Sequence, residues 1–190
     1  AEQHLNNDLQ NYLMEAPYKQ ESLIRYYYDK ADDLFDAHSY HKGSRILHML
    51  RKHLGDDAFF ASLNYYLEIN KFNYVEVHDL RLAFEKIVGE DLNWFFDQWF
   101  LSSGHPKLEI DYQIIKNEGN VELPYSVKLN VAQEPSNENT GLFILPVSVD
   151  IYYDSSVERK SIIIDKSENE FMFPVKEMPK LVNFDADKML

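Results

Sequence analysis

The hydrophobic period of this sequence changes once, at Pro106, and this change constrains the fold more than any other feature. Before Pro106, apolar residues recur every three or four positions, as on one face of an α-helix. After it, apolar and polar residues alternate, as in a half-buried β-strand. Helices followed by strands are typical of an α+β chain. We therefore expect a multi-domain α+β structure, with a helix-bundle-like domain at residues 1–104 and a small antiparallel β-sandwich at residues 105–190.

Amphipathic patterns predict helices in the first domain over residues 4–15, 46–54, 59–67, 80–87 and 92–100. We expect Asp56 and Asp91 to cap two of them, because a carboxylate can accept hydrogen bonds from free backbone N–H groups. Gly89 is expected to end another. The segment before the central helix is irregular. Its pattern is compatible with a helix around Tyr26 to Tyr28 and predicts a loop over residues 29–36.

Alternating patterns in the second domain predict strands over residues 108–114, 125–131 and 147–153, with shorter strands at 160–164, 170–175 and 181–184. Turn-forming residues separate them, as at Asn117 to Asn120 and at Asp154 to Ser156. Several half-buried strands at this spacing indicate an antiparallel sandwich.

Charge and composition exclude several classes of function. The net charge of −13 argues against nucleic acid as a partner, because a phosphate backbone requires clusters of Lys and Arg. No apolar run approaches the roughly 20 residues of a membrane helix, so we expect no membrane segment. The first 30 residues lack the pattern of a signal peptide. The chain begins inside a predicted helix, so we expect a piece of a longer polypeptide, whose localisation the sequence leaves open.

No metal or cofactor site is predicted within the chain. It has no Cys, and none of its seven His is followed by Glu, so the helical His-Glu-x-x-His pair is absent. His38 and His41 are three residues apart, and His48 and His53 are five apart, but neither pair has a third ligand at a meaningful spacing. The nucleophile elbow Gly-x-Ser-x-Gly is also absent, and the six Gly never cluster into a phosphate loop.

Tyr40 is the candidate catalytic residue. It lies at or just before a predicted helix start, on an expected loop, and Gly43 leaves room there for other backbone or a ligand. A phenol is protonated at neutral pH and can donate a hydrogen bond to an oxyanion as a tetrahedral intermediate forms. On composition alone, a tyrosine that packs at a helix start is the commoner case, because pattern does not carry function.

Four stretches of the sequence resemble aminopeptidase N-type zinc metallopeptidases (gluzincins), in the later part of the catalytic domain and the β-sandwich that follows it. They are Tyr40 to Gly43, Ile46 to Phe59, Gly89 to Phe100 and Gly104 to Pro106. The third contains the pattern Gly-x-x-Leu-x-x-Phe-Phe-x-x-Trp, and the fourth resembles the family's Gly-x-Pro junction into the sandwich. The matches occur in the family's order over most of the chain.

This resemblance implies an enzyme that removes N-terminal residues from peptides with one catalytic zinc. In the family, the zinc is held by His-Glu-x-x-His and a Glu on the next helix, and the Tyr of Tyr-x-Lys-Gly stabilises the oxyanion. Tyr40 is the matching position, while Lys42 and Gly43 are expected to shape and pack the turn.

The sequence departs from the family because it lacks the zinc ligands, the Glu general base and the loop that recognises the substrate amine. These lie upstream of the matching Tyr in the family, so an upstream zinc-binding subdomain of the same polypeptide is the expected partner. The resemblance therefore predicts a fragment that is inactive alone. The alternative is a non-catalytic peptide-binding or structural module on the same scaffold, whose parent has lost zinc.

Overall fold

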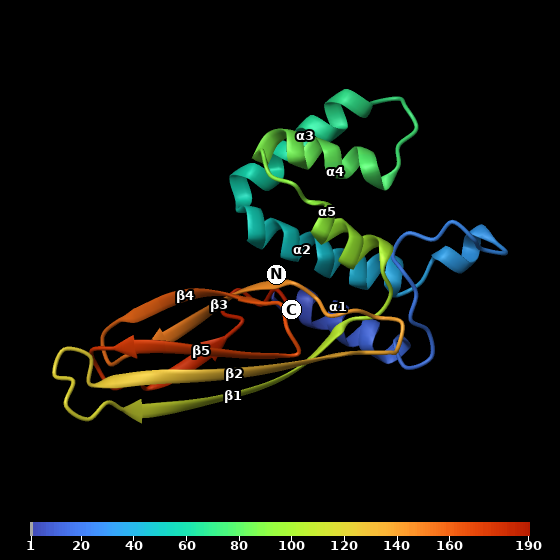
Figure 1. Ribbon diagram of the computed structural model, residues 1–190. Helices are drawn as coiled ribbons and strands as arrows, with labels where there is room; N and C mark the ends of the chain where they lie inside the picture. The colour runs from blue at the N-terminus through green and yellow to red at the C-terminus, as the bar shows by residue number, and fades with distance from the viewer. Residues whose placement is uncertain (1) are drawn as a thin grey trace. The chain divides into compact units, whose positions relative to one another are not determined.

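The computed structural model describes residues 2–190, which divide into two compact units. The first contains residues up to Gly104 together with Leu190, and the second contains residues 105–189. Figure 1 shows helices in the first unit and strands in the second. The predicted α+β class is therefore confirmed. Among the described residues, no helix combines the length and the apolar character needed to cross a membrane.

The helical unit begins with α1 (Glu2–Glu15) and an irregular segment that contains a short 3₁₀ turn (Ala31–Leu34). A π-helical turn (His38–Lys42), called the π-turn below, then runs without a break into α2 (Gly43–Leu54). The remaining helices are α3 (Asp56–Asn70), α4 (Val77–Val88) and α5 (Asn93–Phe96), and α5 continues as a second π-helical turn (Asp97–Leu101).

Local structure differs from the sequence-based expectation in the segment before α2. Tyr26 to Tyr28 are not helical, and all three rings are largely exposed, so a helix there would have no apolar face to bury. The predicted loop at residues 29–36 contains the 3₁₀ turn. The residues around Tyr40, expected in a loop, form the π-turn instead.

Neither Asp56 nor Asp91 takes the cap position predicted for it. Asp56 is the first residue of α3, and its carboxylate accepts hydrogen bonds from Arg51 at 2.8 and 2.7 Å instead of capping the helix. Gly55, with φ of 83°, takes the cap position. Asp91 accepts the backbone N–H of Asn93, the first residue of α5, at 2.8 Å, but Leu92 takes the N-cap position. A neighbouring guanidinium can therefore compete with backbone N–H groups for a cap carboxylate.

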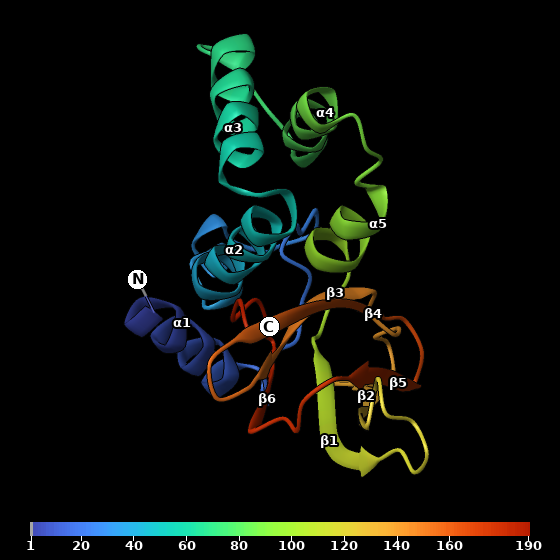
Figure 2. The same cartoon turned by 90° about the vertical axis from the view of Figure 1, so that its left-hand side faces the viewer.

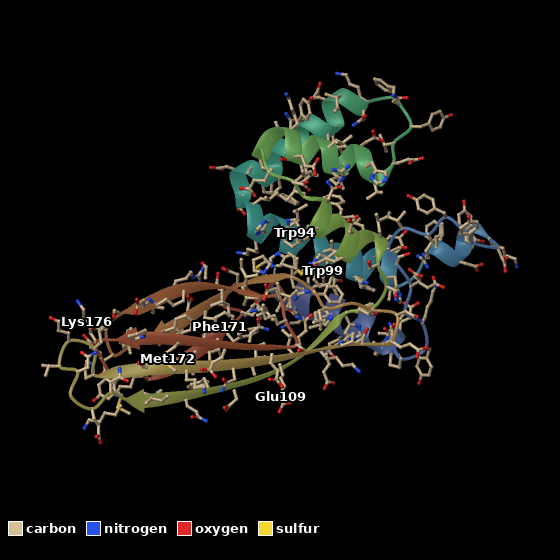
Figure 3. The ribbon with its side chains drawn as sticks, in the orientation of Figure 1. Trp94, Trp99, Glu109, Phe171, Met172 and Lys176 are labelled. Carbon is tan, nitrogen blue, oxygen red and sulfur yellow. The ribbon has the colours of Figure 1, made fainter. Side chains whose placement is uncertain are left out.

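Aromatic and aliphatic side chains fill the core of the helical unit. Leu50, Phe84 and Leu92 are fully buried, and Phe84 packs edge-on against Phe59 with ring centroids 5.5 Å apart. Trp99 is buried, whereas Trp94 is half-buried and packs edge-on against His53 (Figure 3). The amphipathic pattern at residues 92–100 therefore places its apolar face in the core, as expected.

The second unit contains two three-stranded antiparallel sheets. One has the order β1-β2-β5, with bounds Pro106–Lys116, Tyr125–Pro135 and Glu168–Val175. The other has the order β4-β3-β6, with bounds Val157–Ile164, Leu145–Tyr152 and Leu181–Phe184. Figures 1 and 2 show the two sheets as two layers.

The core of the β unit comes from alternate residues of the central strands. In β2 these residues are Val127, Leu129 and Val131, and in β3 they are Val147, Val149 and Ile151. Both strands have partners on either side, so their inner faces are the most completely covered. The two-residue period of the sequence therefore identifies the core face of these strands.

Candidate functional site

Tyr40 lies in the π-turn with 58% of its surface exposed. Its ring packs against Phe35, with centroids 6.1 Å apart and planes tilted by 33°. It lines an open hollow of about 750 Å³ formed by α1 and by residues 35–41. The phenol is therefore accessible to a molecule that enters this hollow.

Backbone hydrogen bonds define the π-turn. The N–H of Tyr40 donates to the carbonyl of Asp36 at 3.2 Å. The N–H groups of His41 and Lys42 both donate to the carbonyl of Ala37, at 3.0 and 2.9 Å. The bond from Lys42 spans five residues, which is the feature that distinguishes a π-helical from an α-helical turn. Such turns are frequent at functional sites.

Two carboxylates hold the backbone N–H groups at the start of the turn. Glu15, at the end of α1, accepts the N–H of Ala37 at 2.7 Å. Asp36 accepts the N–H of Ser39 at 2.8 Å. These groups have no intrahelical partner, so the two carboxylates provide the hydrogen bonds that the turn cannot make itself.

Asp36 is also the centre of a charged cluster. Arg25 donates to its two oxygens at 2.5 and 3.2 Å, and Lys19 donates at 2.6 Å. Burial opposes ionisation of Asp36, but the hydrogen bonds from Arg25 and Lys19 outweigh it and hold the pKa of this carboxyl well below its usual range. Asp36 is therefore charged at neutral pH, with its oxygens fully engaged.

Lys42 and Gly43, at the end of the turn, are both buried. Lys42 is buried; its Nζ donates to the carbonyl of Gly104 at 2.8 Å and lies 5.6 Å from the centre of the Tyr12 ring. Burial lowers the pKa of Lys42 to about 8. A Cβ on Gly43 would meet Leu23 at 3.5 Å, an ordinary contact. The space that Gly43 leaves is therefore lined by a protein side chain, Leu23.

The two histidines of the turn differ in environment. His38 is fully buried and packs edge-on against Tyr12, with ring centroids 5.2 Å apart. Among the described residues, neither of its ring nitrogens has a hydrogen-bond partner, and Nδ1 lies 3.6 Å from Glu15. His41 is half-exposed, and its Nδ1 lies 2.9 Å from Asp8. His41 lines the same hollow as Tyr40, whereas the fully buried His38 is not among the residues that line it.

Within residues 2–190, one group of side chains has the spacing of a metal site: potential ligand atoms of Glu15, Asp36 and His38 lie within 4.8 Å of one another. Its donors do not suit zinc. The Asp36 oxygens bind Lys19 and Arg25, and Glu15 Oε2 accepts a backbone N–H. A divalent cation would have to displace these donors and lie beside two positive charges. We therefore interpret the group as a structural ion cluster.

Comparison with known proteins identifies the family. The model described as the Peptidase family M1 domain matches residues 2–99, more than half of the chain. This chain therefore belongs to peptidase family M1, which confirms the resemblance seen in the sequence.

Individual relatives are aminopeptidases. Aminopeptidase N of Lactococcus lactis subsp. lactis is 42% identical over 79 residues, which are 41% of this chain and 9% of that protein. Aminopeptidase M1 of Arabidopsis thaliana is 27% identical over 140 residues, or 74% of this chain and 15% of that protein. This chain therefore spans less than a fifth of the length of these relatives.

The fold also resembles a solved structure, aminopeptidase A of Legionella pneumophila in complex with aspartic acid. The TM-score is 0.66 with 22% identity, and the match covers 88% of this chain and 19% of that one. At this identity the likeness shows the fold, and its coverage extends beyond the helical unit matched by the family model.

The sequence identified Tyr40 as a candidate but missed the residues around it. Asp36 was expected in a loop, although an Asp three residues before Ser39 has the spacing of a capping residue. Glu15 and Arg25 carry no such signal, because they lie 22 and 11 residues from the groups they bind.

Proposed function

We propose that this chain is part of a zinc-dependent aminopeptidase that removes N-terminal residues from peptides. Within it, Tyr40 donates a hydrogen bond to the oxyanion of the tetrahedral intermediate. Membership of peptidase family M1 and the names of the relatives support peptide hydrolysis. The match of Tyr40 to the family's Tyr-x-Lys-Gly pattern supports its role.

One observation carries the proposal: Tyr40 combines an accessible phenol with a backbone held by hydrogen bonds. The residue is 58% exposed at an open hollow, while the turn that carries it is bound at Ala37 and Ser39 by two carboxylates. A donor that is already oriented before charge develops stabilises a transition state with little reorganisation.

Zinc would activate the scissile carbonyl or the attacking water in such an enzyme. The Glu15, Asp36 and His38 cluster does not suit it, so we place the zinc ligands in an upstream subdomain of the same polypeptide. We accordingly expect the 190 residues alone to bind no catalytic zinc and to show no turnover. Tight zinc binding or hydrolysis by these residues alone would contradict this part of the proposal.

The test is Tyr40→Phe in the longest natural polypeptide that contains this chain. We expect kcat for an aminoacyl anilide to fall by about 10²-fold or more, the usual scale for losing one oxyanion donor. Zinc content, measured by atomic absorption, should be unchanged. Tyr74→Phe is the matched control, because Tyr74 is 99% exposed in the loop between α3 and α4, and it should leave kcat unaltered.

An unchanged kcat in Tyr40→Phe would overturn the role of Tyr40. Absence of zinc and turnover in the long polypeptide itself would favour the alternative, a non-catalytic peptide-binding or structural module on the same scaffold.

A further inference from the structure

We propose that Asp36 is a positioning residue for Tyr40: its carboxylate fixes the π-turn to Arg25 and Lys19 and thereby sets the direction of the Tyr40 hydroxyl. This inference rests on the proposed function of Tyr40. It assigns no contact between Asp36 and the substrate, because the Asp36 carboxylate is fully engaged by protein groups.

Packing around the Tyr40 ring does too little to determine where its hydroxyl points. The ring packs tilted against Phe35, itself 70% exposed, and 58% of Tyr40 remains exposed. The direction of such a side chain depends mainly on the backbone that carries it. Any shift of the π-turn would therefore be transmitted along the length of the phenol to its oxygen.

Asp36 holds that backbone at two consecutive residues. Its carboxylate accepts the N–H of Ser39 at 2.8 Å, and its main-chain carbonyl accepts the N–H of Tyr40 at 3.2 Å. Ser39 is further held through its hydroxyl, which accepts from Arg25 at 2.8 Å and donates to the carbonyl of Leu34 at 2.6 Å. The residue directly before Tyr40 is thus fixed at both its main chain and its side chain.

Arg25 connects this arrangement to the rest of the helical unit. Its guanidinium binds both oxygens of Asp36, and both side chains are 8% exposed. A bidentate contact of this kind constrains the relative orientation of the guanidinium and the carboxylate as well as their distance. The neighbouring Ile24 donates its N–H to the carbonyl of Phe100 at 2.9 Å, so the segment that carries Arg25 is itself anchored to the end of the second π-helical turn.

The principal variant is Asp36→Asn in the longest natural polypeptide, because Asn keeps the size of Asp and one acceptor for Ser39 while losing the charge that binds Arg25 and Lys19. We expect kcat to fall by about 10-fold or more, since misplacement by about 1 Å can reduce rates by up to about 10²-fold. KM should change less than about 2-fold, and zinc content should be unchanged. Arg25→Lys keeps the positive charge but removes the bidentate contact with Asp36, so it should lower kcat in the same way.

A double-mutant cycle separates positioning from general damage to the fold. If Asp36 acts through the Tyr40 hydroxyl, Asp36→Asn should have no further effect on kcat once Tyr40→Phe is present. Asp56→Asn is the matched control, because the Asp56 carboxylate also binds an arginine at 2.8 and 2.7 Å but lies on the surface. It should leave kcat unchanged.

The outcomes distinguish the two proposals. If Tyr40→Phe is fully active, the proposed role of Tyr40 fails and the positioning inference fails with it. If Tyr40→Phe is impaired but Asp36→Asn is fully active, or lowers kcat by the same factor with and without the Tyr40 hydroxyl, the role of Tyr40 stands and the positioning inference is overturned. Should Asp36→Asn fail to fold, the same cycle is run with Arg25→Lys.

Discussion

At the scale of single residues, the helical unit buries several polar groups around one turn. His38, Lys42 and the Arg25–Asp36 pair are all largely removed from solvent within a few residues of Tyr40. Burying such groups is costly unless each charge is neutralised or hydrogen-bonded. Asp36 and Lys42 meet this condition through specific partners, whereas burial lowers the pKa of His38, whose ring nitrogens have no hydrogen-bond partner among the described residues.

The buried His38 predicts a pH dependence of stability. Burial, assisted by the charge of Lys42 and opposed by Glu15, lowers the pKa of His38. The unfolded chain therefore binds a proton at this residue at higher pH than the folded chain does. The free energy of unfolding should be highest above the ordinary His pKa of about 6.5 and should fall as the pH is lowered below it.

Urea denaturation at pH 7.5 and 5.5 tests this expectation. His38→Phe should reduce the difference in unfolding free energy between the two pH values. It should not abolish the difference, because burial also lowers the pKa of His53. His78→Phe, at an exposed position of α4, should keep the full difference. A difference that is identical in His38→Phe and in the unmodified protein would contradict the prediction.

At the scale of elements, two π-helical turns occur at helix ends, one leading into α2 and one continuing α5. Hydrophobic periodicity predicted the helical character at residues 92–100. Over a single turn, however, it cannot distinguish backbone hydrogen bonds between residues five apart from those between residues four apart. The helix caps show the same limit. Asp91 accepts the N–H of Asn93 but Leu92 takes the N-cap position, and Asp56 binds Arg51 because that guanidinium is within reach.

The two tryptophans labelled in Figure 3 differ in burial, so we expect their replacement to change the free energy of unfolding by different amounts. Trp99 is 5% exposed, so Trp99→Ala should lower the free energy of unfolding of the helical unit by about 3–5 kcal/mol. Trp94→Ala should cost clearly less, because Trp94 is only half-buried. Chemical denaturation of both variants gives the comparison. A loss below about 1 kcal/mol in Trp99→Ala would be inconsistent with a buried ring.

At the scale of the whole molecule, the chain consists of a helical unit and a β unit, each with its own core. The core of the β unit comes from residues of its own two sheets, and its strands are connected by short turns and by the longer segments 117–124 and 136–144. A unit that buries its own apolar residues is expected to fold without its neighbour.

We therefore predict that residues 105–189 fold when expressed alone. Far-UV circular dichroism should show a β-type spectrum, and urea should unfold the unit in a single cooperative transition. Val149→Asp is a suitable negative control, because Val149 is fully buried in the central strand β3 and a charge there would have no partner. A non-cooperative transition for residues 105–189 would show that the β unit needs the helical unit.

The sequence by itself determined the α+β class, the main helices and strands, and Tyr40 as the candidate, because periodicity, turn residues and a four-residue pattern are properties of neighbouring residues. Only the tertiary structure decided how Tyr40 is held. Arg25 and Lys19 lie 11 and 17 residues from Asp36, and Glu15 lies 22 residues from Ala37. In a chain with 32 acidic residues, sequence patterns cannot show which carboxylate meets which cation, because that choice depends on how separate segments pack.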